Sequence, residues 1–413
     1  EESDWSSDVC SSDLDTLDSL FAINCELCYE CIDSSGCYDC RYTQESSNCR
    51  NSRFLFDCQG CSNCIMCQGL KNKTYYYKNE PISEEEYKGL ISKIENSSRS
   101  ELEDLRREFK EFRLQIPVKY SRLINTENCS GHNLKSAKDC KAVFDGENIE
   151  VCSYGINVND AKDCVDINFA AANTSNHYEV MCTGVDANNI LFSIDTWPNV
   201  SNLLYCDSCS NGTKDCFGCI GLRHGQYCIL NKQYTKEDYE AKVAEIIGRM
   251  KESGEWGEFF PMSLSPFGYN ESTAINYFNL KQDDAVNMGA NWREKEFDTE
   301  FSGDFYVSHE KISSYENEAE REKLLSGVIK CEVSGKPFKI LPKELAFYME
   351  NKIPIPNKHY LVRIEERFKL RTPRQLHHRK CMKDGCQNEF ETTYAPDRPE
   401  RVYCEKCYQE EIK

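Results

Sequence analysis

The spacing of apolar and polar positions predicts short β-strands over the first part of the chain. Between residues 25 and 67 the apolar positions are mostly cysteines on a twelve-residue grid, separated by Ser, Asn, Asp, Gly, Tyr and Arg. Turn formers and strand formers in such short alternation are typical of β-strands. The apolar residues do not recur every 3.6 positions here, so a helix is not predicted. The grid has three rows, which are Cys25, Cys37, Cys49 and Cys61, then Cys28, Cys40 and Cys64, then Cys31 and Cys67.

A second array of the same kind occupies residues 119–234. Its first cysteines, Cys129, Cys140, Cys152 and Cys164, are spaced by 11, 12 and 12 residues. The tetrapeptide Ala-Lys-Asp-Cys ends at Cys140 and again at Cys164, 24 residues later. A repeat built from two similar halves favours a β-solenoid, in which short strands stack the same position coil upon coil.

Helical patterns follow both arrays. Ser83 precedes three glutamates, and Thr235 has an aspartate three residues later, so both positions are expected to begin helices. We expect residues 82–118 and 235–260 to form helical caps for the open ends of the arrays. Residues 261–326 mix prolines with short apolar clusters and are expected to be a loop-rich connector.

The two arrays are also copies of each other. The motif Cys-x-x-Cys-x-Gly-Leu begins at Cys64 and again at Cys216, 152 residues later. The first array, residues 15–81, has fewer residues before this motif than the second, so we expect that its N-terminal half has been lost. The predicted fold class is therefore a multidomain, mainly β protein with two cysteine-rich, β-solenoid-like arrays capped by helices and a C-terminal zinc-ribbon region.

The clearest chemistry lies at residues 379–413, which contain two close pairs of cysteines. Cys381 and Cys386 are followed, seventeen residues later, by the pair Cys404 and Cys407. Two such pairs on either side of a strand-like segment predict a zinc ribbon, in which four thiolates surround one ion. Four thiolates favour a closed structural site over a catalytic one. The alternative is four unrelated buried thiols or a disulfide pair.

Residues 327–378 resemble a second ribbon that has lost its metal. The segment Cys331-Glu-Val-Ser-Gly-Lys-Pro-Phe is similar to the Cys-x-x-Cys-Gly-Lys-x-Phe pattern of small bacterial zinc-ribbon proteins. That resemblance places Cys331, Ser334, His359 and Val362 at the four ligand positions. Serine and valine are not usable zinc ligands, so Cys331 and His359 alone would make a weak site.

The whole layout resembles a family of bacterial proteins that join zinc ribbons to cysteine-rich repeat modules. The matching stretches include Cys28-Tyr-Glu-Cys31, Phe54-Leu-Phe-Asp-Cys58, Tyr227-Cys-Ile-Leu-Asn-Lys-Gln-Tyr234 and Arg379-Lys-Cys381. Some members are labelled CoA-transferase-like (CaiB/BaiF), but no motif in this sequence supports that chemistry. The resemblance therefore implies an architecture and no activity.

The composition of the chain disfavours two classes of partner. The chain has 413 residues, 26 cysteines and a formal net charge of −19, which argues against bulk nucleic-acid binding by the whole chain. No window holds eighteen apolar residues, so no membrane-spanning helix and no membrane partner are expected. Residues 4–14 are similar to a translated sequencing adapter, so residues 1–14 are interpreted as an artefact of short-read, metagenomic assembly, the chain as a fragment, and its true N-terminus as missing.

A basic stretch at residues 363–380 differs from this acidic background, because seven basic and two acidic residues give it a net charge of +5. One hypothesis is contact with nucleic-acid phosphates. The other is a solvated helix face that pairs with the acidic remainder of the protein. The basic residues are Arg363, Arg367, Lys369, Arg371, Arg374, Arg379 and Lys380.

The repeat cysteines have three interpretations. They are metal ligands, with Cys58, Cys61, Cys64 and Cys67 as the candidate set, or disulfides of an exported protein, or reduced thiols that face inward as small hydrophobic side chains. We favour the third for most of them. A zinc ribbon also favours a reducing compartment, so a cytoplasmic location is expected.

These observations favour a zinc-binding interaction or scaffold protein with an unidentified protein partner. The sequence lacks a Gly-x-Ser-x-Gly motif, a phosphate-binding loop and a His-Glu-x-x-His motif, which disfavours an enzyme. Two alternatives stay open. One is an enzyme of the carbohydrate-active type with paired carboxylates on a solenoid face, and the other is an exported, disulfide-rich binding module.

Overall fold

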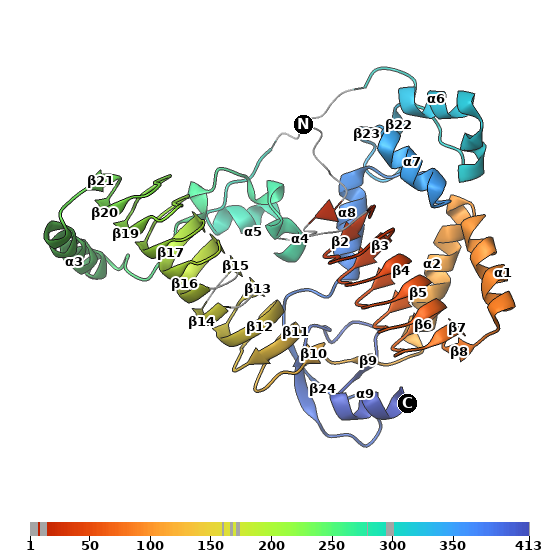
Figure 1. Cartoon of the computed structure of the whole chain (residues 1–413), viewed down its shortest axis with the longest axis horizontal. Helices are drawn as coiled ribbons and strands as arrows, with labels where there is room; N and C mark the ends of the chain where they lie inside the picture. Colours follow the sequence, from red (N-terminus) through yellow and green to blue (C-terminus); the bar gives the residue numbers. More distant parts are fainter. Residues whose placement is uncertain are drawn as a thin grey trace.

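The computed structural model describes residues 7–8, 15–158, 161–165, 168–170, 174–278, 280–294 and 301–412. Within these residues the chain is mainly β, with two large sheets, three two-stranded sheets and nine α-helices (Figure 1). Of the segment interpreted as adapter, residues 7–8 form β1 and the others lie outside the described residues.

The first array is an eight-stranded sheet whose strands follow one another in sequence order. Neighbouring strands are parallel and offset by twelve residues, as in the pairs Tyr38 with Arg50 and Arg50 with Ser62, and only the last pair is antiparallel. This offset equals the interval between the cysteines of each row. The strands are β1 (Ser7–Asp8), β2 (Ser19–Leu20), β3 (Tyr29–Ile32), β4 (Tyr38–Gln44), β5 (Arg50–Phe56), β6 (Ser62–Gln68), β7 (Thr74–Tyr77) and β8 (Glu80–Pro81).

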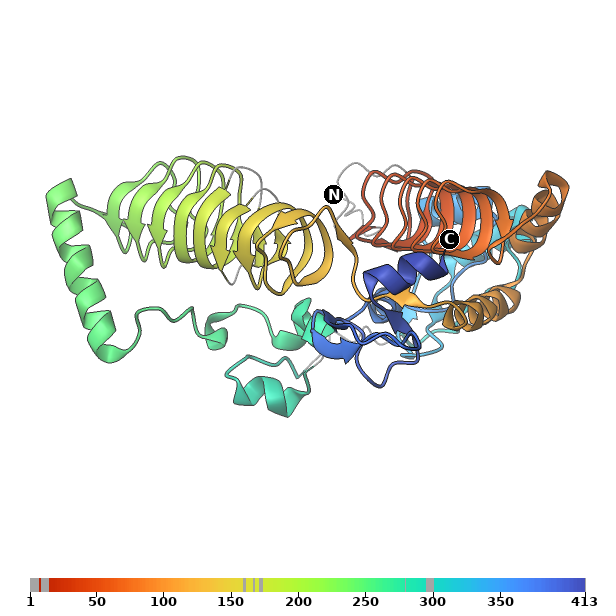
Figure 2. The same ribbon diagram turned by 90° about the horizontal axis from the view of Figure 1, so that it is seen from below.

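The second array is a twelve-stranded sheet with the same parallel order, and it ends in an antiparallel pair. Its offset grows from eleven residues, between Leu123 and Leu134, to thirteen, between His177 and Ile190. Figure 2 shows each of the two arrays as successive turns of ribbon. The strands are β10 (Leu123–Ile124), β11 (Gly131–Lys138), β12 (Val143–Ser153), β13 (Ile156–Val158), β14 (Ala161–Val165), β15 (Asn168–Ala170), β16 (Thr174–Thr183), β17 (Asn188–Thr196), β18 (Ser201–Leu204), β19 (Lys214–Phe217), β20 (Gln226–Ile229) and β21 (Lys232–Gln233).

The backbone of the first array has a shorter period of three residues, which the cysteine grid alone does not reveal. From Asp15 to Lys78 nearly every third residue has a positive φ, for example +53° at Asn24 and Asn48 and +62° at Gly36. From Asp15 to Gly69 the residue after each such corner is buried, as at Cys25, Cys37 and Cys49. Left-handed backbone favours Asn, Asp and Gly, and these residues occupy many of the corners.

This corner geometry makes a prediction about stability. We expect Asn48→Ala to lower the free energy of unfolding by about 1 kcal/mol, because alanine tolerates left-handed backbone less well than asparagine. Arg50→Ala, two residues later on an exposed position of β5, removes a side chain without that backbone conflict and should change little. Thermal unfolding followed by circular dichroism compares the two, and equal midpoints would contradict the role of the corners.

Helices pack beside the arrays. α1 (Glu84–Glu95) and α2 (Arg99–Leu114) share a core with the first sheet, in which Leu102 and Phe109 lie among Phe54 and Ile65. α3 (Lys236–Ser253) lies beyond β20 at the far end of the second array (Figure 1). Ser83 and Thr235 cap α1 and α3 as the sequence predicts, since each side chain accepts a hydrogen bond from the third backbone N–H of its helix.

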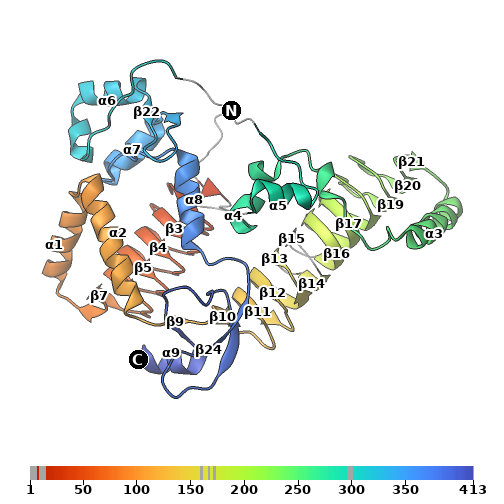
Figure 3. The ribbon, with the colours of Figure 1, turned by 180° about the vertical axis from the view of Figure 1, so that it is seen from behind.

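The remaining segments bridge the two arrays. In the connector, the residues from Tyr306 onward join the core of the following segment, where Tyr315 and Leu324 are fully buried beside Tyr29 of the first array. α8 contacts both β2 and α4, so it lies between the first array and the connector (Figure 3). The bridging elements are η1 (Met262–Leu264), η2 (Tyr269–Glu271), α4 (Ala274–Phe278), α5 (Gln282–Asn287), η3 (Ile312–Glu316), α6 (Glu318–Ser326), β22 (Ile329–Lys330), β23 (Pro337–Phe338), α7 (Pro342–Glu350) and α8 (Tyr360–Leu370).

The C-terminal segment folds back beneath the first array (Figure 2). β24 (His377–Lys380) and β25 (Glu389–Thr392) form an antiparallel hairpin. β26 (Val402–Tyr403) pairs in parallel with β9 (Val118–Lys119), the strand that joins α2 to the second array. α9 (Glu405–Glu411) follows β26 directly.

Candidate metal centre

Four cysteines converge where the C-terminal hairpin meets α9. Cys381 follows β24, and Cys386 ends a tight turn in which Gly385 has a φ of +78°. Cys404 is the N-cap residue of α9, and Cys407 lies in its first turn. The backbone N–H of Cys381 donates to the carbonyl of Asn388 at 2.9 Å, which closes the loop between the hairpin strands.

The geometry of these four side chains suits one metal ion. Their sulfur atoms all lie within 4.8 Å of one another, and the sulfurs of Cys386 and Cys404 are 4.0 Å apart. Bonds of about 2.3 Å to a shared tetrahedral ion would place pairs of sulfurs just under 4 Å apart. Cys381, Cys404 and Cys407 are buried, and Cys386 is half-buried. The cluster can therefore bind a metal with little rearrangement.

Backbone dipoles support thiolates at this position. The N–H of Cys404 donates to the Cys381 sulfur at 3.3 Å, as backbone amides do around metal-bound thiolates. Burial raises the pKa of the Cys404 thiol, but hydrogen bonds from the Cys407 backbone and from neighbouring side chains lower it to about 7. Burial raises the pKa of Cys381. A metal ion would supply the positive charge that ionises the whole set.

The cluster is attached to the first array by its flanking residues. The Tyr408 hydroxyl donates to an Asp57 carboxylate oxygen at 2.7 Å, and burial raises the pKa of Asp57. The Thr392 hydroxyl donates to the carbonyl of Tyr120 at 2.6 Å. Lys119 of β9 forms an ion pair with Glu405 of α9 at 2.5 Å. The metal centre thus lies at a junction between the C-terminal segment and the arrays.

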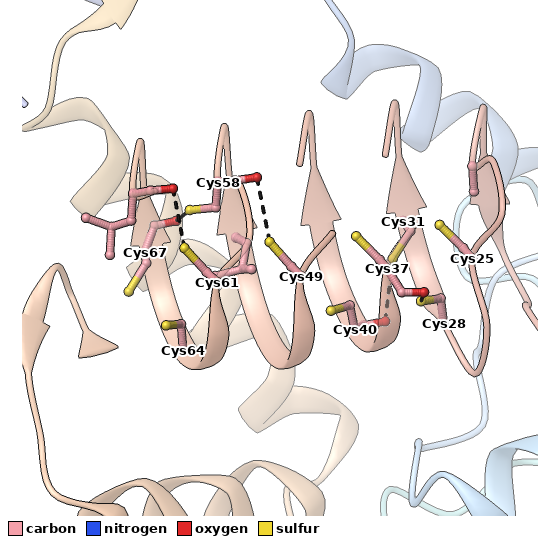
Figure 4. Close-up of a cluster of buried hydrophobic side chains, with 13 residues drawn as sticks. Cys25, Cys28, Cys31, Cys37, Cys40, Cys49, Cys58, Cys61, Cys64 and Cys67 are labelled. Carbon is pink, nitrogen blue, oxygen red and sulfur yellow. Dashed lines mark hydrogen bonds between the residues drawn. The ribbon is translucent and has the colours of Figure 1, made fainter. Parts of the chain in front are cut away.

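The repeat cysteines of the first array face inward on separate sides of each coil (Figure 4). Cys58, Cys61, Cys64 and Cys67 are at most 1 % exposed, and all four are thiols without a disulfide. Their thiols donate to backbone carbonyls, for example Cys61 to Leu70 at 3.3 Å. Within the described ranges, the C-terminal cluster is the one set of three or more potential ligands whose atoms lie within 4.8 Å. This arrangement favours the interpretation as small buried side chains.

The segment that resembles a second ribbon has a similar turn at its cysteine. Cys331 is buried, and its sulfur accepts a hydrogen bond from the Ser334 N–H at 3.4 Å. His359 is the N-cap residue of α8 and accepts from the Leu361 N–H at 3.3 Å. The structure gives His359 a capping role, and Cys331 and His359 belong to no set of three close ligands among the described residues.

Most of the basic stretch faces carboxylates of the chain itself. Arg363 and Arg367 of α8 both pair with the buried Asp18. Arg371 bridges the arrays, since it contacts Asp33 at 2.7 Å and Asp145 at 3.0 Å. This arrangement agrees with pairing to the acidic remainder of the protein, but these arginine side chains are at most 12 % exposed, so they do not form the solvated helix face that was expected.

The other basic residues of the stretch also contact polar groups of the chain. Arg374 reaches Asp145 at 2.7 Å, and Arg379 donates to the carbonyls of Tyr394 and Ala395. Lys369 and Lys380 are 75 % and 71 % exposed, and they pair with Glu365 at 4.0 Å and Glu389 at 2.9 Å. Two scattered lysines make a small surface for phosphate contacts.

The aspartates that bind these arginines, at what we call the junction between the two arrays, were not predicted from the sequence. Asp33 and Asp145 occupy left-handed corners of the two arrays, with φ of +48° and +58°. The signal available in the sequence was their place among the Asn, Asp and Gly residues that recur at left-handed positions of the arrays. The arginines that they bind are more than 220 residues away along the chain, so no local pattern could connect them.

Ion pairs neutralise several of the carboxylates that line two cavities in the described part of the chain. A cavity of about 640 Å³ lies between α2 and α8, where Glu30 pairs with Arg106 and Glu366 with Lys358. At the junction, a cavity of about 10 Å³ is lined by Asp33, Glu45 and Asp145, which is room for one water molecule. Paired carboxylates of this kind hold structure together and offer little acid–base chemistry.

Glu45 at the junction predicts a pH dependence. It is 8 % exposed, and burial raises its pKa to about 7, with further contributions from Asp57 and Asp33. The pKa of Glu45 in the folded chain is therefore higher than its ordinary value of 4.5. The contribution of the neutral carboxyl to stability is fully present below about pH 4.5 and is lost as the pH rises to 7. We expect a loss of about 2–3 kcal/mol between pH 5 and pH 8 from this group. Glu45→Gln should lack this part of the profile and unfold at a higher temperature than the natural chain at pH 8, and identical profiles would contradict the assignment.

Comparison with known proteins adds no family. No protein-family model matches the sequence, and no curated protein matches it. In the described part of the chain, no helix is long and apolar enough to cross a membrane. The resemblance to zinc-ribbon proteins with cysteine-rich repeats therefore rests on the sequence motifs alone.

Proposed function

We propose that this protein is a zinc-binding scaffold, in which one structural zinc ion at Cys381, Cys386, Cys404 and Cys407 fixes the C-terminal segment to the first array. The convergence of these four sulfurs within 4.8 Å carries the proposal. Zinc is the ion of choice for four thiolates in a tetrahedral set. With all four positions taken by protein ligands, the ion has no site for a substrate or a reactive water.

The proposed scaffold consists of two β-solenoids. The sequential parallel strands, offset from their neighbours by eleven to thirteen residues, support this interpretation. Stacked corners form polar ladders, in which Asn189 donates to Asn202 and Asn202 to Asp215, each at 2.8 Å. Long, regular faces of this kind suit a protein partner. The buried thiols and the ribbon fit a reducing compartment such as the cytoplasm.

Zinc content tests the proposal. We expect one zinc ion per chain by native mass spectrometry of the purified 413-residue chain. Cys386→Ser removes a ligand and should abolish zinc retention, whereas Cys331→Ser changes a buried cysteine outside the cluster and should keep one ion. A chain without zinc, or zinc retained by the Cys386→Ser variant, would overturn the proposal.

A further inference from the structure

One row of thiols in the first array is unbroken over four consecutive coils. Cys25, Cys37, Cys49 and Cys61 occupy the same inward position, each one twelve-residue offset from the next (Figure 4). The residues that follow them, from Glu26 and Tyr38 onward, pair directly between coils, which fixes the register of the row. The other rows are interrupted, since Cys40 pairs with Ser52 and Cys31 with Thr43.

The distance between neighbouring side chains of this row suits a bridging metal ion better than a disulfide. Neighbouring parallel strands lie about 4.8 Å apart, so side chains stacked in register repeat at that distance. A disulfide needs its sulfurs at about 2.05 Å, which would require both side chains to leave the stack. Two metal–thiolate bonds of about 2.3 Å in a straight line span 4.6 Å. A two-coordinate ion therefore fits between successive coils with little movement of the backbone.

The environment of the row is dry and polarisable. The four side chains are at most 2 % exposed, and each sulfur contacts a carbonyl oxygen nine residues ahead, at 3.3 Å from Cys61 to Leu70 and 3.6 Å from Cys49 to Cys58. Burying a net charge here is costly, so a neutral complex is required. A monovalent cation held by one thiolate and one thiol is neutral.

We propose that the row Cys25, Cys37, Cys49 and Cys61 binds soft monovalent d¹⁰ cations, with Cu(I) as the natural occupant, in linear two-sulfur sites between neighbouring coils. Soft thiolate ligands select Cu(I) over harder ions. One ion joins Cys25 to Cys37 and a second joins Cys49 to Cys61. At each site two sulfur–metal bonds form and one thiol proton passes to the buffer, with no change in oxidation state. This site differs in geometry and metal class from the tetrahedral C-terminal cluster.

A pair of matched double variants tests the proposal. Cys37→Ser with Cys49→Ser leaves Cys25 and Cys61 three coils apart and removes both sites. Cys31→Ser with Cys67→Ser removes two equally buried thiols whose register partners are Thr43 and Leu55. Serine already occupies inward positions at Ser34, Ser46 and Ser52, so all four replacements suit the coil. Both variants keep the C-terminal cluster, whose metal content cancels in the comparison.

The full-length chains are refolded anaerobically from guanidinium chloride with zinc and buffered Cu(I), so that the ion can reach the interior, and circular dichroism verifies that they fold. Native mass spectrometry should count two fewer copper ions on the Cys37/Cys49 variant than on the natural chain, and an unchanged number on the Cys31/Cys67 variant. The difference between the X-ray absorption spectra of the natural chain and the Cys37/Cys49 variant should show two sulfur neighbours per copper. Equal copper counts on the two variants, or three or more sulfurs per ion, would overturn the proposal.

Discussion

Asp145→Asn is expected to open the junction between the arrays and to lower the free energy of unfolding by about 3–5 kcal/mol, as the loss of one partner from a buried charge network does. The Asp145 carboxylate accepts hydrogen bonds from Arg371 at 3.0 Å, Arg374 at 2.7 Å and Asn133 at 2.9 Å. Its side chain is 12 % exposed, and those of the two arginines are 9 % and 5 % exposed. A neutral amide would leave two buried guanidinium groups facing one carboxylate, that of Asp33.

Two further variants separate charge from backbone effects, because all three aspartates occupy left-handed corners with φ between +48° and +58°. Asp33→Asn should cost less than Asp145→Asn, since Asp33 binds Arg371 alone and has one buried oxygen without a hydrogen-bond partner. Asp139→Asn changes an exposed corner whose carboxylate accepts from Asn128, and should cost almost nothing. Small-angle scattering and thermal unfolding measure the series, and an Asp145 variant as stable and compact as the Asp139 variant would contradict this role of the junction.

The same network gives the junction a dependence on acid. Burial raises the pKa of Asp145, but the charges of Arg371 and Arg374 outweigh it and hold the pKa well below its ordinary value. A lowered folded pKa means that the contribution of Asp145 is present above about pH 4 and is lost as the pH falls toward the folded pKa. The Asp145→Asn variant should therefore lose less stability on acidification than the natural chain.

The features that could be predicted from the sequence depend on residues that are close together along the chain. The twelve-residue interval of the cysteines equals the register between neighbouring parallel strands of the first sheet. Ser83 and Thr235 begin helices, because capping depends on residues within one turn. The four C-terminal cysteines come together, because a short hairpin is enough to join their two pairs. In each case the determining contacts are close in sequence.

The ion pairs between the arrays could not be predicted in this way. Arg371 meets Asp33 and Asp145 only because the C-terminal segment returns across both arrays, which no nearby residue reveals. The three-residue corner pattern was visible in principle, since Asn, Asp and Gly are frequent at every third position of the first array. It was hidden because large residues such as Phe54 and Tyr42 also adopt the left-handed corner, where burial against neighbouring elements compensates for the strain.

Cys407→Ser is expected to release the C-terminal segment from the first array. Structural zinc contributes about 10–16 kcal/mol to small thiolate sites, and α9 has seven residues, too few to be a stable helix alone. If the proposed ion is bound there, its loss removes the link that joins α9 to the β24–β25 hairpin. We expect amide hydrogen exchange in residues 377–412 to accelerate at least a hundredfold, whereas β4, β5 and β6 keep their protection, because their register is independent of the metal.

Tyr408→Phe isolates the docking contact from the metal. This variant keeps all four cysteines and loses the hydrogen bond from the Tyr408 hydroxyl to Asp57, which leaves a buried carboxylate with one partner fewer. We expect it to retain zinc and the internal protection of the hairpin, and to lower the free energy of unfolding by about 1–3 kcal/mol. If the Cys407→Ser and Tyr408→Phe variants showed the same modest change in exchange, the ion would not be what holds the segment together, and packing against β9 and the first array would be sufficient.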